Sequence, residues 1–373
     1  MIVKVTMKNS YNLPDDLVRG ILVTLPVKSL LRFKCVCRNW CALITSSSFV
    51  NEHLHHKENP TRFLIYTRDP YPYISINTFM LPEKISSSVT PMLKKPSYLQ
   101  IPGMLKIGGH VDGIFFLRSE NSMALWNPAT REFRPLPPYL LKLCGGDKFG
   151  FGFDSLSCDY KVMQIVEEHN YVKESWNGLA AVYSLSNDCW RNLTFNIDIN
   201  SKILFNSLCS TCVNGVYYWC AAKATEVIPH DTYEKVILLV SFDMHNEVFG
   251  EIPGPDILVK SLHAGSLTLY NESLCLLVHG YDDQERPSID IWLMNDEKLW
   301  TKVMNVIVPI PAYYDPRCRG FWGHDKVILE HKGQPILIYD TKSHEFTNLF
   351  HREEKTKRTR VSSYRESLVS IKK

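Results

Sequence analysis

Apolar residues follow a helical period near the start of the chain. Leu17, Ile21 and Leu25 recur every four residues, which places them on one face of a helix. Asp15 and Asp16 stand just before this run, where the positive end of a helix favours acidic side chains. Pro26 follows Leu25 and ends the helix, because proline cannot continue the backbone hydrogen bonding.

Two shorter helical patterns follow, over residues 30–36 and 40–44. The serine run at 46–48 predicts a loop after them. The pattern therefore predicts a small module of three helices within residues 13–50.

This helical module holds more apolar side chains than three short helices can bury among themselves. Of its 38 residues 21 are apolar, more than half, against 45% in the whole chain. A unit of roughly 40 residues seldom supports a core of its own, so the surplus must face a neighbour. Two interpretations stand at this point: a helical cap packed on the rest of the chain, or a module that binds a partner protein.

Beyond residue 60 the pattern changes to short apolar strands joined by polar turns. Five stretches share the form of a strand, a turn and a second strand with an aromatic residue: 124–136, 181–193, 240–252, 290–303 and 337–349, with 63–79 as a degenerate sixth. Their first strands carry Trp126, Tyr183, Phe242, Trp292 and Tyr339, at steps of 57, 59, 50 and 47 residues.

Further strands are predicted between these hairpins, at 113–117, 161–166, 213–219, 273–278 and 326–330. The pairs Asp112-Gly113 and Asn214-Gly215 are favourable for tight hairpin turns. About four strands in about fifty residues is the period of a kelch-like propeller blade. The fold class is therefore α+β in two modules: a small three-helix unit, then an all-β domain, expected to be a β-propeller of five or six blades. A large antiparallel sandwich is the alternative.

Composition and charge narrow the function classes. The chain has 42 basic and 39 acidic residues, so its net charge is 42 − 39 = +3, which argues against non-specific binding to nucleic acid. Residues 1–12 lack the apolar core of a signal peptide, and the clean apolar run at 236–242 is too short to cross a membrane. We therefore expect a cytoplasmic or nuclear protein with no membrane partner, whose 11 cysteines are free thiols.

The helical module resembles the F-box. The resemblance runs through LPDDLVRGILVTLPVKSLLRFKCVCRNWCALITSSSFV, with Thr24 as a departure where many members carry a basic residue. It implies docking on a Skp-type adaptor, which connects to a cullin and a RING subunit. By the family pattern, the residues that form or support the docking surface are Leu13, Pro14, Leu17, Ile21, Leu22, Leu25, Pro26, Leu30, Val36, Cys37 and Trp40. The module carries five basic and two acidic residues, which would suit an acidic partner.

The β-rich part resembles the F-box-associated domain of plant F-box proteins. The matching blocks are GFGFDSLSCDYKVMQIV, VYSLSNDCWRNL, IDIWLMNDEKLWTKV and YRESLVSI. Within that family the chain is similar to S-locus F-box and S-locus-F-box-like proteins, some of which recognise S-ribonucleases in pollen. The resemblance implies an F-box at 13–50, a linker at 51–62 and an F-box-associated domain at 63–371.

The expected function is that of a substrate-recognition subunit in an SCF-type (Skp–cullin–F-box) ubiquitin ligase. Such a subunit is not an enzyme and needs no cofactor or metal; its partners would be the adaptor and a target protein, an S-ribonuclease if it is a pollen-type member. Two alternatives remain: a propeller binding protein whose helices only cap it, and a propeller enzyme. Target contacts are expected in variable loops such as 229–234 and 282–287.

Several other motifs have plainer interpretations. Cys209 and Cys212 have half the spacing of a zinc site, without a second pair. Three cysteines at 35–41 and three histidines at 53–56 are expected to be core thiols and a polar exit from the helices. The glycines at 150 and 152 lack the lysine of a phosphate-binding loop, so they indicate a strand with a close backbone approach. The basic stretch 351–360 is interpreted as a solvated loop before a last strand at 364–371.

Overall fold

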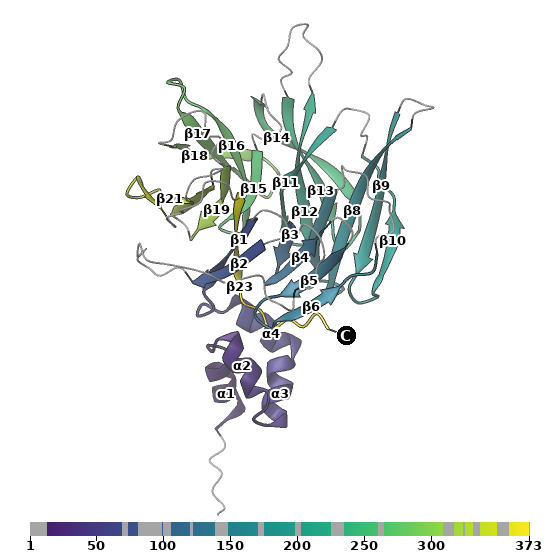
Figure 1. The fold of residues 1–373 in the computed structure, drawn as a ribbon, viewed down its shortest axis with the longest axis vertical. Coiled ribbons are helices and arrows are strands. Elements are labelled where there is room, and N and C mark those ends of the chain that lie inside the picture. The colour runs from purple at the N-terminus through teal and green to yellow at the C-terminus, as the bar shows by residue number, and fades with distance from the viewer. Residues whose placement is uncertain are drawn as a thin grey trace, which may run out of the picture.

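The structure is a computed structural model of the chain. It describes residues 13–68, 74–80, 99, 106–119, 122–138, 148–170, 175–197, 203–224, 235–259, 265–308, 317–323, 325–330, 336–348 and 358–372. Helices stand at the N-terminal end and strands follow throughout, so the α+β division into two modules is confirmed (Figure 1).

The helical module contains four helices: α1 (Asp15–Leu22), α2 (Val27–Phe33), α3 (Arg38–Thr45) and α4 (Ser47–His55). The sequence predicted three, because the serine run was interpreted as a loop. Ser46 is instead the N-cap of α4, and its hydroxyl accepts a hydrogen bond from the Phe49 N–H at 3.4 Å. α4 is held by the burial of Phe49 and Leu54.

The strands of the described residues form six antiparallel sheets. Five of them have four strands: β3 (Lys106–Val111), β4 (Ile114–Arg118), β5 (Met123–Asn127) and β6 (Glu132–Pro135); β7 (Lys148–Asp154), β8 (Asp159–Asn170), β9 (Ser175–Ser184) and β10 (Cys189–Leu193); β11 (Ile203–Val213), β12 (Val216–Ala224), β13 (Lys235–Asp243) and β14 (Phe249–Val259); β15 (Gly265–Tyr270), β16 (Ser273–Tyr281), β17 (Pro287–Met294) and β18 (Trp300–Ile307); and β19 (Arg317–Trp322), β20 (Lys326–Glu330), β21 (Leu337–Asp340) and β22 (Glu345–Asn348). The remaining sheet joins β2 (Ile74–Met80), β1 (Thr61–Arg68) and β23 (Arg358–Arg365).

These sheets are arranged as a ring, so the prediction of a β-propeller is confirmed and the sandwich alternative is wrong. The five four-stranded sheets are complete blades, and the three-stranded sheet closes the ring by pairing the last strand with the first, from Thr61 opposite Arg365 to Arg68 opposite Arg358. An apolar cluster fills each space between neighbouring sheets. In one of them Phe116 packs against Phe151, with ring centroids 6.2 Å apart.

All five predicted hairpins are the outer strand pairs of the blades, and the degenerate sixth is β1 with β2. The tight turns are confirmed as well: Asp112 and Gly113 both have positive φ, as do Asn214 and Gly215. The predicted strand at 213–219 is wrong in one respect, because it runs across the second of these turns.

Gly150 confirms the close approach expected of its strand. A Cβ there would lie 2.5 Å from Met163 Cε and 2.9 Å from both Trp219 and Tyr217. Met163 is the cross-strand partner of Gly150 on β8, whereas Trp219 and Tyr217 lie on β12 of the next blade. Glycine at this position therefore lets the innermost strand pack against that blade.

The prediction of a last strand at 364–371 is wrong in its bounds. β23 ends at Arg365, and residues 366–372 form a C-terminal segment without strand pairing. The buried side chain of Asn127 donates hydrogen bonds to two backbone carbonyls of this segment, those of Ser367, at 3.0 Å, and Val369, at 2.8 Å. Residues 351–357 of the basic stretch lie outside the described residues.

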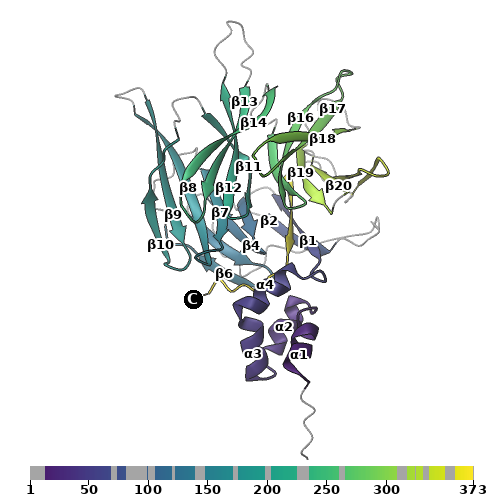
Figure 2. The ribbon, with the colours of Figure 1, turned by 180° about the vertical axis from the view of Figure 1, so that it is seen from behind.

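The C-terminal segment runs between the propeller and the helical module (Figures 1 and 2). Leu368 is only 3% exposed and packs in the apolar core of the helices, with Leu22 and Phe49. Asn59 adds a polar connection, since its side chain donates to the carbonyls of His53 and Glu366. The helices are thus joined to the propeller by both ends of the β-domain.

The expected linker at 51–62 is partly taken up by secondary structure. α4 runs to His55 and β1 begins at Thr61, which leaves 56–60 between them. The domain division at 13–50, 51–62 and 63–371 stays a prediction.

Candidate functional site

The helical module separates its apolar residues into a buried and an exposed set. Leu22, Leu30, Ile44 and Phe49 are at most 1% exposed and fill the core of the four helices. Four other apolar residues are 55–59% exposed: Leu13, Leu17, Ile21 and Val36. Large apolar side chains this exposed on so small a unit indicate a surface for a partner.

The predicted docking residues fall on both sides of this division. Seven of them are exposed and can touch a partner: Leu13, Pro14, Leu17, Ile21, Pro26, Val36 and Cys37. Leu25 and Trp40 are half-buried, and Trp40 packs edge-on against Phe33 with ring centroids 5.6 Å apart. Leu22 and Leu30 are buried, so they can only support the surface from below.

Helical spacing groups the exposed residues. Leu17 and Ile21 lie one turn apart on α1, and Leu13 precedes the helix on the same spacing. Val36 and Cys37 lie in the connection between α2 and α3, where Cys37 also caps α3 by accepting the Trp40 N–H at 3.5 Å. Two short apolar stretches are thus presented to solvent by helices whose other faces are buried.

His53 holds the turn between α1 and α2. Its ring is 2% exposed, and its Nε2 lies 2.9 Å from the Leu25 carbonyl, to which it donates as the Nε2–H tautomer. The Nδ1 atom is buried with no hydrogen-bond partner among the described residues. Burial lowers the pKa of His53, and the hydrogen bond to Leu25 offsets this only in part. The ring is therefore neutral at pH 7 and fixes the carbonyl beside Pro26.

This arrangement predicts that the helical module loses stability in weak acid. A histidine whose pKa is lowered on folding contributes fully above its ordinary value of about 6.5, and the contribution is lost as the pH falls toward the lowered value. Thermal unfolding of the full chain is expected to shift to lower temperature between pH 7.5 and 5.5. In His53→Gln, which keeps a donor but does not titrate, that pH dependence should shrink; an equal shift in both proteins would contradict the assignment.

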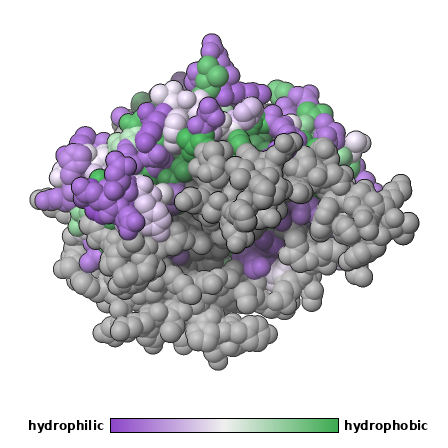
Figure 3. Space-filling model, turned by 90° about the horizontal axis from the view of Figure 1, so that it is seen from above, coloured by the Kyte–Doolittle hydropathy of each residue, from purple (hydrophilic) through white to green (hydrophobic). Residues whose placement is uncertain are grey.

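The second candidate surface is the end of the propeller away from the helices. The turn at Gly113 lies on the helical side, because a Cβ there would be 2.5 Å from the Arg365 carbonyl oxygen. The β7–β8 turn lies beside it, since the Tyr160 hydroxyl donates to Asp112 at 3.0 Å. Strands alternate in direction, so the β16–β17 loop at 282–286 lies at the opposite end, as Figure 1 shows. In Figure 3 the coloured residues of that end are mainly hydrophilic along the outer edge.

Of the two loops predicted to contact a target, one is described. In 282–287, Asp282 accepts hydrogen bonds from the Arg286 side chain at 2.8 Å and from the Gln284 N–H at 3.0 Å. These contacts hold the pKa of Asp282 below its usual range, so the carboxylate is charged at the loop surface. The other loop, 229–234, lies outside the described residues.

The ring encloses a central cavity of about 470 Å³. All six innermost strands contribute to its wall, including β23 of the closing sheet. The wall carries Lys106, Arg118 and Lys148 together with serine and threonine hydroxyls. No sequence motif marks these cations, because they lie on three different strands.

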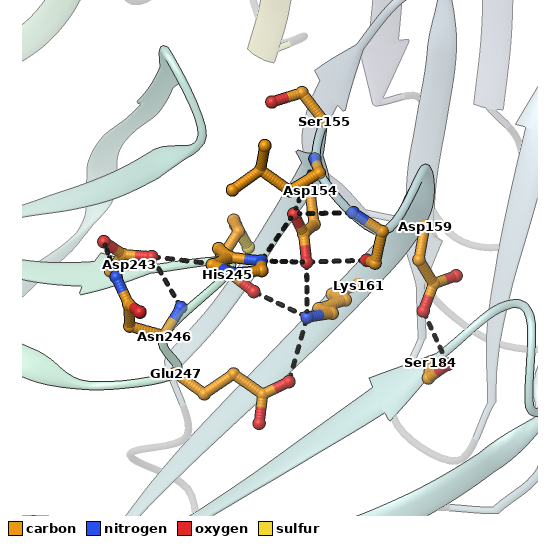
Figure 4. Close-up of polar contacts among 12 residues, drawn as sticks. Asp154, Ser155, Asp159, Lys161, Ser184, Asp243, His245, Asn246 and Glu247 are labelled. Atoms are coloured by element: carbon orange, nitrogen blue, oxygen red, sulfur yellow. Dashed lines mark hydrogen bonds and ion pairs between the residues drawn. The ribbon is translucent and has the colours of Figure 1, made fainter.

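A buried charge cluster joins the blades of β7–β10 and β11–β14 (Figure 4). Lys161 is 6% exposed, and its Nζ donates to Asp154 at 3.0 Å, to Glu247 at 2.9 Å and to the Met244 carbonyl at 2.6 Å. Burial alone would raise the pKa of Asp154, but hydrogen bonds from Ser157 and Lys161 outweigh it and hold the pKa well below its usual range. All three hydrogen-bond donors of the lysine ammonium have acceptors, so the cluster connects the two blades through ion pairs and hydrogen bonds.

The expectation of core thiols at 35–41 is wrong for Cys35 and Cys37, which are exposed on the short connection between α2 and α3. Within the described ranges no group of three or more histidine, cysteine or acidic side chains is placed to hold a metal ion. Cys212 lies on β11, and burial raises the pKa of its thiol to about 12, so it is unreactive at pH 7. The helices in the described part of the chain are too short or too polar to cross a membrane.

Comparison with known proteins agrees with both modules. A protein-family model described as F-box associated beta propeller domain matches residues 71–371, and one described as F-box domain matches residues 11–52. The F-box/kelch-repeat protein At3g23880 of Arabidopsis thaliana is 25% identical over 313 residues, which cover 80% of this chain and 81% of that protein. The F-box protein At3g08750 of the same plant is 29% identical over 330 residues, covering 84% of this chain and 79% of its own length.

Proposed function

The chain belongs to the F-box proteins whose second domain is an F-box-associated β-propeller, and on this premise we propose that it is the substrate-recognition subunit of an SCF-type ubiquitin ligase. The F-box would bind a Skp-type adaptor and, through it, a cullin and a RING subunit. The propeller would hold a target protein for ubiquitination.

One observation supports this proposal above the others. A helical module with a full core of its own still presents Leu17, Ile21 and Val36 to solvent, each more than half exposed. A unit that only capped the propeller would have no use for these side chains. Leu368 packs in the core of the helices, so the module also contacts the C-terminal segment of the β-domain. Under the proposal, capping and partner docking would use different faces of the same module.

In this role the chain performs no chemistry. The helical module lies at one end of the molecule, and the end of the propeller that would hold the target lies at the other (Figures 1 and 2). A rigid connection between them would hold the target near the ubiquitin-carrying subunit, which accelerates transfer by positioning. Such complexes act in the cytoplasm or the nucleus, and an S-ribonuclease remains a predicted target for a pollen-type member.

The proposal predicts that Leu17→Ala together with Ile21→Ala weakens binding of a Skp-type adaptor at least ~30-fold. Interface anchors typically cost about 2 kcal/mol each on truncation, and half that sum is about 2 kcal/mol, or more than one decade. Both side chains are exposed, so the core should stay intact. The measurement is titration of the purified adaptor into the full chain, wild type and variant.

The matched control is Leu156→Ala, since Leu156 is 73% exposed on a propeller turn and outside the helical module. It should bind the adaptor like the wild type. Unchanged affinity in the double variant, with both proteins folded by circular dichroism, would remove the F-box surface as the docking site.

A further inference from the structure

The sheet that closes the propeller has one strand fewer than the complete blades. Among the described residues it consists of β23, β1 and β2, and no strand of that part of the chain pairs with the outer edge of β2. Each of the other five sheets continues with a fourth strand. Alternate residues of an edge strand direct their N–H and C=O groups outward, so β2 offers a row of backbone donors and acceptors to a further strand.

β2 also lacks the features that usually protect an exposed edge. Its sequence, ISINTFM, contains no charged residue, no proline and no glycine. The outer strand of every complete blade carries a charge: Glu132 in β6, Arg191 in β10, Glu251 in β14, Lys302 in β18 and Glu345 in β22. Charged side chains on an edge strand hinder its pairing with another chain. The edge of β2 is therefore the one among these six that is suited to accept a strand.

The complete blades show what kind of strand fits there. In four of the five, the next-to-last residue of the third strand is aromatic and stands directly opposite an aromatic residue of the outer strand: Trp126 and Phe133, Tyr183 and Trp190, Phe242 and Phe249, Tyr339 and Phe346. The ring centroids of the last three pairs are 5.5, 4.8 and 4.7 Å apart. Such pairs stabilise a sheet beyond the area that they bury.

The closing sheet has the first member of this pair, and the sequence lacks the second. Phe79 is the next-to-last residue of β2, which is the third strand of its sheet, and it stands opposite Phe63 on β1. In those four blades the outer aromatic residue follows seven positions after the first, as Phe133 follows Trp126. Seven positions after Phe79 the chain has Ser86, and no aromatic residue occurs before Tyr98.

We propose that the outer edge of β2 binds an extended segment of the target protein as a fourth strand. The segment would run antiparallel to β2, as the outer strands of the complete blades run to their neighbours. It would begin with an aromatic residue opposite Phe79 and continue toward Ile74 with β-branched residues. Main-chain hydrogen bonds would supply the affinity and the aromatic residue the selectivity.

The identification of the segment as part of a target rests on the proposed function, whereas the binding itself concerns the propeller alone. The test therefore uses the purified full chain without adaptor, and its failure is separate from failure of adaptor docking. The probe is a fluorescein-labelled pool of peptides of about eight residues, a common strand length. Tryptophan is fixed near the N-terminal end, and valine, isoleucine and threonine are mixed at the other positions. By fluorescence anisotropy this pool should bind about tenfold more tightly than a pool with serine in place of tryptophan.

A matched pair of variants locates the binding. Asn77→Lys places a charge on β2, as the other outer strands have, and should weaken binding of the tryptophan pool about fivefold through the loss of cross-strand contacts. Asn192→Lys makes the same change at an exposed position of β10 and should bind the pool like the wild type. Equal binding by the two variants would overturn the proposal.

N-methylation of the peptides tests the pairing without any change in the protein. A strand pairs with one neighbour through every second residue, so methylation of one alternate set of amides should abolish binding and methylation of the other set should not. Equal effects of the two sets would contradict pairing as a strand.

Hydrogen exchange distinguishes the other possible occupants of this edge. Binding of the tryptophan pool should slow the exchange of amides within β2. A dimer that Asn77→Lys dissociates would assign the edge to a second copy of the chain. Slow exchange along β2 before any peptide is added, together with no peptide binding, would assign it to the chain's own residues. Either result would overturn the proposal, as would protection that falls only outside β2.

Discussion

Replacing Lys161 by alanine is expected to lower the free energy of unfolding by about 3–5 kcal/mol, because it removes the buried ammonium from the buried Asp154 carboxylate. Asp154 is 2% exposed and Glu247 is half-buried, and both accept hydrogen bonds from the Lys161 ammonium. The cluster joins two blades, so the loss should spread to the ring. The measurement is urea unfolding of the full chain at pH 7, followed by tryptophan fluorescence.

The control is Lys302→Ala, which removes an ion pair of similar length at the surface. Lys302 Nζ lies 2.8 Å from Asp290 Oδ2, but the lysine side chain is 43% exposed. Exposed pairs contribute about 0–1 kcal/mol, so this variant should unfold close to the wild type. Similar decreases in the free energy of unfolding of the two variants would show that burial of the Lys161 cluster adds nothing to its contribution to stability.

Replacing Leu368 by alanine is expected to loosen the helical module from the propeller. Leu368 is 3% exposed in the core of the helices, and removing a buried leucine side chain costs about 2–5 kcal/mol. The adaptor surface on α1 is not touched by this change. We therefore expect adaptor binding to persist while ubiquitin transfer to a held target falls, since the target is no longer rigidly positioned.

Limited proteolysis can follow the loosening directly. Cleavage within 56–60, between α4 and β1, should become faster in Leu368→Ala than in the wild type. Val369→Ala is the control, because the neighbouring Val369 is part of a different apolar cluster, in the propeller. Equal cleavage in all three proteins would show that the C-terminal segment does not hold the two modules together.

The outer hairpins of the blades could be predicted from sequence, because each carries an aromatic residue on a strand followed by a polar turn. Trp126, Tyr183 and Phe242 are all at most 1% exposed, so their regular recurrence in the sequence marks successive blades of the propeller. The innermost strands gave a weaker signal. One side of β3 and β23 faces the cavity with glycine, serine and basic residues, and the apolar alternation of a half-buried strand is lost.

The candidate docking residues could be found from the F-box spacing, but their division into contact and support could not. Leu17 and Leu22 are both apolar residues of one helix, and only packing decides that the first is exposed and the second buried. The role of Leu368 could not be predicted from the sequence for another reason. Its helical neighbours lie more than 300 residues earlier in the chain, and no local pattern encodes a contact of that range.

Ubiquitin transfer in a reconstituted reaction tests the central proposal most directly. The full chain is combined with a Skp-type adaptor, cullin, RING subunit, activating and conjugating enzymes, and ubiquitin, and conjugates on the chain's own lysines and on any protein it holds are measured. We predict adaptor-dependent conjugation with the wild type and its loss with Leu17→Ala and Ile21→Ala together. Equal conjugation by the two proteins, or none with the wild type in the presence of a bound adaptor, would contradict the assignment as a substrate receptor.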